Sequence, residues 1–168
     1  ELEGTELKKI LLRLNQDYAA YFVKERIGKK LANSGFTVRY HVKKIGATDL
    51  TVPEIGEIDI LAYKSSSSKL IVGECKFHVL AGVTPRRIRR EVDAYTDDDG
   101  YIEKLKQKST WVDNNINTII EFLGIANPPK KPECVPVFFT NWYSSVQAVT
   151  SGITIVQEDD IESWASHF

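Results

Sequence analysis

The sequence predicts one mixed α/β domain with helices on both faces of a single sheet. Its 168 residues, 42% hydrophobic and 27% charged, fit one soluble globular domain with a proper core. Short apolar runs of strand length alternate with longer segments of helical periodicity. The resulting order is helix, three strands, helices, strand, helix, strand, helix, which is typical of a layered α/β architecture.

The N-terminal third begins with helices. Residues 5–14 place Leu7, Ile10, Leu11 and Leu14 at helical spacing, which predicts a short amphipathic helix. Asp17 is expected to cap a second helix that runs to about Ser34, and Gly35 is a plausible stop. A strand over 36–44 and a loop over 46–53 follow.

The C-terminal half continues the alternation. A loop over 82–85 leads into a basic helix start at 86–90, and an acidic break at 97–100 precedes a long helix over about 101–123. Residues 128–132 form a proline-rich connector. The remaining predicted elements are a buried strand at 134–140, a short helix at 144–150, a strand at 153–156 and a last helix at 159–165.

Two apolar runs in the middle of the chain each carry charge where a buried strand should carry none. They are Gly56–Tyr63 and Leu70–Lys76, and Lys64 with four serines reads as the hairpin turn between them. Charges at the edge of an apolar sheet are costly unless they pair or bind a metal. This cost is the first indication of a functional site.

Strand alternation predicts how these charges are grouped. Glu74 and Lys76 share one face and Cys75 takes the other; on the preceding strand Glu57 and Asp59 share a face. The residues expected on the opposite face of that strand are Ile58 and Ile60. If the strands pair, Asp59, Glu74 and Lys76 converge at one end of the sheet.

The residue types in this group suit hydrolysis of a phosphodiester. That reaction needs a divalent cation, an aimed water molecule and a site that tolerates a polyanion. Asp59, Glu74 and the backbone carbonyl of Cys75 offer the oxygen ligands that Mg²⁺ prefers. Lys76 is placed to orient the water or steady the phosphate.

Asp59, followed after fourteen residues by Glu74-Cys75-Lys76, resembles the D…(D/E)-x-K signature of the PD-(D/E)xK nuclease superfamily. In outline the resemblance covers about residues 18–165 and is nearest to Mrr-type restriction endonucleases and archaeal Holliday-junction resolvases. It implies a restriction-endonuclease-like three-layer α/β/α fold with a central mixed sheet. It also implies a DNA endonuclease that depends on Mg²⁺ or Mn²⁺. The supporting segments outside the hairpin are 25–27, 31, 35–38, 139–141, 148, 152–155 and 160–161.

Some features depart from the superfamily pattern. Ile58 stands where proline often precedes the aspartate, and Mrr-type sites often have Gln-x-Lys in place of Glu-x-Lys. The segment 81–131 is longer than the corresponding part of a minimal resolvase. It is interpreted as a helical insert for specificity or dimerisation. The chain has no methionine, so we expect a piece of a larger protein with further domains.

Further residues are assigned to the site with their structural alternatives. Glu25 resembles the helix carboxylate that completes such sites, or is a surface glutamate among lysines. For Glu57 a solvated strand end is favoured, and for His78 a structural role. Phosphate contacts are predicted for a basic helix start and two strand lysines, with a solvated helix face as the alternative; these residues are Arg86, Arg87, Arg89, Arg90, Lys43 and Lys44.

Two other interpretations remain open. The first alternative to a nuclease is a catalytically inactive nuclease-fold module that binds nucleic acid or assembles a complex. The second is a small α/β protein whose strand charges form a structural salt bridge. The net charge of −1 favours no partner class by itself. No apolar run has membrane-spanning length, no signal peptide is recognised, and two strand cysteines suit an intracellular protein. The expected partner is DNA, and cutting both strands favours a homodimer.

Overall fold

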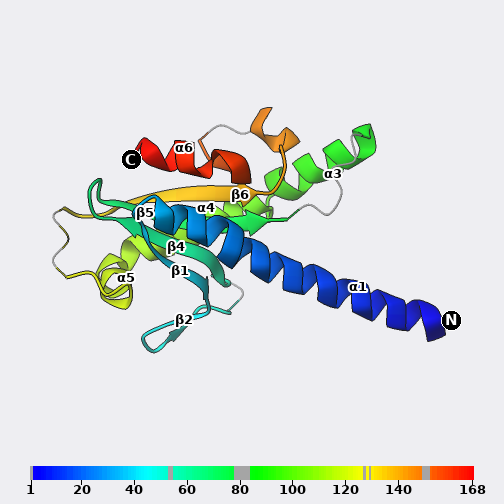
Figure 1. Ribbon diagram of the computed structural model, residues 1–168, viewed down its shortest axis with the longest axis horizontal. Coiled ribbons are helices and arrows are strands. Elements are labelled where there is room, and N and C mark those ends of the chain that lie inside the picture. The colour runs from blue at the N-terminus through cyan, green and yellow to red at the C-terminus, as the bar shows by residue number, and fades with distance from the viewer. Residues whose placement is uncertain (1, 53–54, 78–83, 127, 129, 149–151) are drawn as a thin grey trace.

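The computed structural model describes residues 2–52, 55–77, 84–126, 128, 130–148 and 152–168. Its centre is a five-stranded mixed sheet with strand order β1-β4-β5-β6-β7, flanked by helices (Figure 1). The first three strands pair antiparallel and the last two join them in parallel. These strands are β1 (Thr37–Val42), β4 (Ile58–Lys64), β5 (Lys69–Lys76), β6 (Glu133–Thr140) and β7 (Thr154–Gln157). The predicted α/β class is confirmed.

Helices cover both faces of the sheet. The N-terminal helix consists of α1 (Leu2–Tyr21), a π-helical stretch η1 (Phe22–Gly28) and α2 (Lys29–Asn33). Together with α6 (Ile161–Ser166) its inner part covers one face. The other face is covered by α3 (Pro85–Thr96), α4 (Tyr101–Asn114) and α5 (Ile116–Phe122). Two 3₁₀ turns, η2 (Ser145–Ala148) and η3 (Glu158–Asp160), flank β7.

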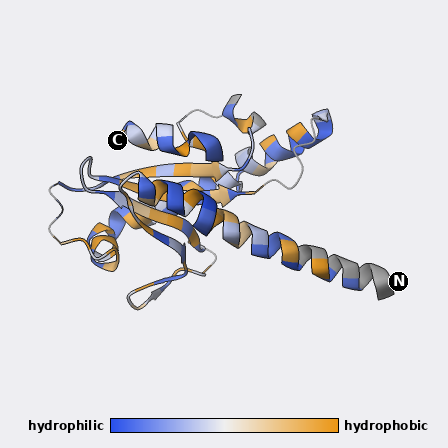
Figure 2. Cartoon of the chain, viewed as in Figure 1, coloured by the Kyte–Doolittle hydropathy of each residue, from blue (hydrophilic) through white to orange (hydrophobic). Residues whose placement is uncertain are grey.

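The sheet divides the core into two apolar layers. The layer under the N-terminal helix includes Ile27, Ala62 and Phe139, while the layer under α4 includes Tyr63 and Phe138. Neighbouring residues on one strand therefore enter different layers, as strand geometry requires. The central strands are accordingly coloured mainly as hydrophobic in Figure 2. No helix among the described residues is both long enough and apolar enough to cross a membrane.

The predicted break between two N-terminal helices is wrong. Asp17 lies exposed inside α1, and the helix continues through η1 and α2 to Asn33. Residues 5–16 contain no glycine or proline, so nothing interrupts the helix ahead of Asp17. Gly35, with a φ of +87°, follows the C-terminal end as predicted.

Four other elements differ from the predictions. The strand expected at 36–44 ends at Val42, and part of the expected 46–53 loop forms a second hairpin from β2 (Lys44–Ile45) and β3 (Thr48–Asp49). The long helix expected at 101–123 breaks at Asn115, whose side-chain amide donates to the Trp111 carbonyl at 2.8 Å. The short helix expected at 144–150 is a 3₁₀ turn over 145–148, and residues 149 and 150 lie outside the described residues.

On β1 and on β4 the apolar side chains switch from one face of the sheet to the other, and the two switches lie at facing positions. Val38 packs in the layer of the N-terminal helix but Val42 in the opposite layer. On β4 the same reversal separates Ile60 from Ile58, which corrects the expectation that these two share a face. Between the pairs Tyr40–Ile60 and Val42–Ile58 stands His41, whose φ is +54°. This left-handed conformation, rare outside glycine, breaks the alternation.

Gly73 of β5 lies so close to the side chains of both neighbouring strands that it leaves no room for a Cβ atom. A Cβ atom there would lie 2.9 Å from Cε2 of Phe139 and 3.0 Å from Cβ of Ile60. Gly73→Ala is therefore expected to lower the free energy of unfolding by about 1–3 kcal/mol through overpacking. Urea denaturation measures the loss. The double variant with Phe139→Leu should lose less than the sum of the two single changes; an additive result would contradict the steric explanation.

Candidate active site

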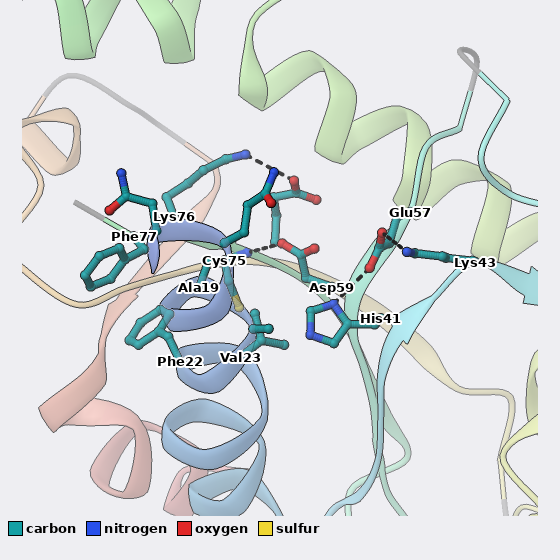
Figure 3. Close-up of a pocket in the computed structure, with 14 residues that line it drawn as sticks. Ala19, Phe22, Val23, His41, Lys43, Glu57, Asp59, Cys75, Lys76 and Phe77 are labelled. Carbon is teal, nitrogen blue, oxygen red and sulfur yellow. Dashed lines mark hydrogen bonds and ion pairs between the residues drawn. The ribbon is translucent and has the colours of Figure 1, made fainter. Parts of the chain in front are cut away.

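An open cavity of about 890 Å³ lies between the N-terminal helix and the ends of three strands (Figure 3). Its helix wall is polar at Asn15 and Gln16 and then small at Ala19 and Ala20. Its other lining residues are Phe22 and Val23 from η1, His41 and Lys43, Glu57 and Asp59, and the consecutive run Glu74, Cys75, Lys76 and Phe77. The cavity thus gathers the charged residues that the sequence placed at this end of the sheet.

Asp59 lies where the β4–β5 ladder stops. The last register pair is Ile60 with Gly73, and beyond it the backbone N–H of Cys75 donates to Asp59 Oδ2 at 2.8 Å. Burial raises the pKa of Asp59 to about 6, and repulsion from the Glu74 carboxylate adds to the rise. The Cys75 hydrogen bond, Lys108 and Lys76 oppose it. Asp59 is thus a carboxylate whose negative charge is incompletely compensated.

Glu74 is held between two ammonium groups. Lys76 Nζ lies 3.1 Å from Oε1, and Lys108 Nζ lies 2.6 Å from Oε2. Cys75, between Glu74 and Lys76 in sequence, packs instead in the apolar layer under the N-terminal helix. Burial raises the pKa of its thiol well above the ordinary value, so the thiol stays neutral. Strand alternation therefore separates the two charges from the thiol as predicted.

Lys76 rests on an aromatic stack. Its Nζ lies 3.9 Å from the centroid of the Tyr101 ring, close enough for a cation–π contact. Tyr101 packs edge-on against Tyr95, which in turn packs against Phe138 of β6. Three rings thus support the ammonium group from the core side and limit the directions in which it can point.

Lys108 is a further residue of the site that was not predicted from the sequence. It lies on α4, is only 7% exposed, and also donates to the Glu57 carbonyl at 2.6 Å. The signal was present in the sequence, because Lys108 stands between Leu105 and Val112 on the buried stripe of a helix. A lysine in that position needs an acceptor. Lys108 and Tyr101, both from the 81–131 segment, therefore contact the Glu74 and Lys76 side chains of the cavity.

A second polar group lies beside Asp59. His41 Nδ1 is 2.9 Å from Glu57 Oε1, and Lys43 Nζ is 3.5 Å from Glu57 Oε2. One ligand atom from each of His41, Glu57 and Asp59 can be chosen so that all three lie within 4.8 Å of one another. Glu57, for which a solvated strand end was favoured, is therefore a cavity residue that pairs with two neighbours.

Several predicted site residues lie elsewhere. Glu25 is not in the cavity lining and pairs with Lys29 at 2.6 Å on the outer side of the helix, which corrects its assignment to the site. The pair with Lys29 lowers the pKa of Glu25. Lys44 is exposed on β2, and the arginines of α3 are exposed outside the cavity lining; they are Arg86, Arg87, Arg89 and Arg90. His78 lies outside the described residues.

Comparisons with known proteins do not assign a family. The sequence matches no family model, and no curated protein matches it. One solved structure, described as the protein of unknown function AF1548, aligns with a TM-score of 0.39 and 18% identity. The alignment covers 82% of this chain and 58% of that one, so the chain spans less than two thirds of the length of its structural neighbour.

Proposed function

We propose that this chain is a metal-dependent nuclease domain that hydrolyses phosphodiester bonds in DNA. The observation that carries the proposal is the convergence of Asp59, Glu74 and Lys76 in an open cavity, two carboxylates and an ammonium group at the end of one sheet. The mixed sheet between two helical layers agrees with the restriction-endonuclease-like fold that the sequence resemblance implies.

The donor set fits a hard divalent cation. Burial raises the pKa of Asp59, repulsion from Glu74 raises it further, and a cation between the two carboxylates would relieve that repulsion. The N–H of Cys75 points to Asp59, and the carbonyl of a strand residue faces the same neighbouring strand as its N–H. Asp59, Glu74 and the Cys75 carbonyl would therefore hold Mg²⁺ or Mn²⁺. The cation would supply charge neutralisation at the scissile phosphate and a more acidic water.

The protein residues perform the remaining tasks. Lys76, fixed by Glu74 and the Tyr101 ring, presents an ammonium group that donates to a phosphate oxygen or to the attacking water. Lys43 adds a second cation on the opposite side of Asp59. The four exposed arginines of α3 offer bidentate contacts to the phosphate backbone further along a bound strand. A homodimer and additional domains remain predictions of the sequence.

One observation favours a catalytically inactive DNA-binding module instead. Both oxygens of Glu74 are already engaged by lysines, an arrangement that lowers the need for a cation. A salt bridge without further function is less consistent with the charges, because they line an open cavity and Asp59 is left with a raised pKa. Cleavage experiments separate these alternatives.

The test is a nuclease assay. Supercoiled plasmid, linear duplex and a four-way junction are incubated with Mg²⁺ or Mn²⁺, and we expect cutting by the wild type that falls at least 100-fold in Asp59→Ala and Lys76→Ala. Lys69→Ala is a matched control, since Lys69 is at the other end of β5 in a partly exposed pair with Glu133. Equal cutting by wild type and both site variants would overturn the proposal. Binding without cutting would support the inactive module.

A further inference from the structure

The three tryptophans lie in very different surroundings. Trp111 and Trp164 are partly buried against the two apolar layers, which agrees with a role in the core. Trp142 is 55% exposed, and the neighbouring Tyr143 is 70% exposed. Two adjacent large aromatic side chains with this exposure lose hydrophobic free energy unless something covers them.

These two rings lie at the catalytic end of the sheet. They follow Thr140, the last residue of β6, and Thr140 stands in register with Lys76 of β5. Because β5 and β6 run parallel, both strands finish at the same end of the sheet. Trp142 and Tyr143 therefore lie at the same end of the sheet as Lys76, beyond the neighbouring strand.

The aromatic pair is held in place by hydrogen bonds on both sides. The Thr140 hydroxyl donates to the Trp142 carbonyl at 2.8 Å, and the buried Ser144 hydroxyl donates to Glu91 at 2.7 Å. The Ser144 oxygen also accepts the N–H of Val146 at 3.2 Å. The loop is thus anchored, so the two rings are presented with a small entropy cost on binding.

The hydrogen bond from Ser144 to Glu91 also links the loop that carries the rings to the charged helix α3. Glu91 follows directly on the arginine run of α3, and helix α3 packs against the turn η2 that follows Tyr143. The four arginines are exposed and form no ion pair with any other described residue; they are Arg86, Arg87, Arg89 and Arg90. The anchored aromatic pair therefore adjoins a helix whose N-terminal half carries four exposed arginines.

We infer that Trp142 and Tyr143 form a stacking platform for unpaired bases, so that the preferred substrate carries a single-stranded segment. This inference rests on the proposed function and specifies its substrate. Exposed rings beside a cationic surface suit single strands, because every unpaired base offers a π-face while arginines hold the backbone. In an intact duplex those faces are already stacked, and freeing one costs unstacking energy. A flap, gapped duplex or junction with unpaired bases fits this surface.

Binding without cleavage tests the inference. In EDTA and 100 mM NaCl, fluorescence anisotropy compares a labelled 20-mer of thymidylate with a 20-base-pair duplex. We expect the single strand to bind at least tenfold more tightly. Trp142→Ala and Tyr143→Ala should each weaken single-strand binding about tenfold and leave duplex binding nearly unchanged. Tyr40→Ala is the matched control, since Tyr40 is 41% exposed but lies on β1, at the opposite edge of the sheet.

A conservative variant gives an independent readout. Bound thymidylate should quench the tryptophan fluorescence of the wild type, and Trp142→Phe should keep the affinity within about threefold while most of the quenching disappears. Equal affinity of wild type and both alanine variants for the single strand would overturn the inference. So would a shift of the alanine variants from dimer to monomer in sedimentation with DNA affinity intact, which would assign the rings to a protein contact.

The outcomes also separate this inference from the proposed function. Metal-dependent cutting with no role for the two rings leaves the nuclease proposal standing and removes the stacking platform. Ring-dependent binding of single strands without cutting by any metal-loaded protein supports the platform and removes the nuclease proposal.

Discussion

Asp59→Asn is expected to be more stable than the wild type at pH 7, by about 2–3 kcal/mol in the free energy of unfolding. The pKa of Asp59 is about 6 in the folded protein against an ordinary value of 3.8. At neutral pH the folded state therefore carries a carboxylate that it disfavours, whereas the unfolded chain carries it without cost. Asparagine removes the charge and keeps an oxygen that can accept the Cys75 N–H.

Because the pKa of Asp59 is raised on folding, the free energy of unfolding depends on pH in one direction. Between about pH 4 and pH 6 the folded wild type binds a proton that the unfolded chain has already released, so its stability falls as pH rises through this window. The advantage of Asp59→Asn should be complete above pH 6 and vanish below pH 4. Urea denaturation at pH 3.5, 5 and 7 measures it. A stability difference that does not change with pH would contradict the raised pKa.

The same pair of proteins reports on the cation. Millimolar Mg²⁺ should raise the melting temperature of the wild type, because a ligand that binds only the folded state stabilises it. It should leave Asp59→Asn unchanged and should not restore cleavage. Asp49→Asn is a suitable control, since Asp49 is an exposed carboxylate on β3 whose pKa is lowered by hydrogen bonds from Thr51. That substitution should not stabilise the protein.

Lys108→Met is expected to cost about 3 kcal/mol in the absence of metal. Methionine fills a similar volume but leaves Glu74 Oε2 and the Glu57 carbonyl without their ammonium donor in a largely buried place. Lys104→Met is the matched control, because Lys104 is exposed on the same helix and should change stability by less than 0.5 kcal/mol.

Metal binding should respond to Lys108→Met in the opposite direction. Removal of a cation 2.6 Å from Glu74 increases the negative charge of the site, so Mn²⁺ should bind about tenfold more tightly and recover most of the lost stability. Isothermal titration with Mn²⁺ and melting with and without Mn²⁺ measure both effects. A variant that is destabilised but binds Mn²⁺ no better than the wild type would show that Lys108 is structural and does not compete with a cation.

The sequence predicted those parts of the site that depend on local patterns. Asp59, Glu74 and Lys76 lie on two strands joined by a short hairpin, so the pairing of these strands brings the three residues to the same end of the sheet. Lys108 joins them only through the packing of α4, more than thirty residues further along the chain. His41 enters the cavity through a backbone conformation that no local pattern indicates.

Glu25 shows that a residue on a correctly predicted helix can still lie outside the site. Residues 15, 16, 19, 20 and 23 form the cavity side of one continuous helix. Glu25 was assigned to the site from the family resemblance, with a surface glutamate among lysines as the alternative. Once α1 and η1 are one helix, the side that faces the cavity is fixed, and Glu25 falls on the side of Lys29.

The paired reversal at His41 and Asp59 ties the lengths of β1 and β4 to each other. A one-residue insertion in an ordinary strand moves every later side chain to the other face. In this sheet the side chains of both β1 and β4 switch faces at facing positions, so both apolar layers stay filled. A change of length near either position would therefore put one strand out of step with its neighbour. Related chains are expected to gain or lose residues here in both strands together, so that the two segments evolve as one unit.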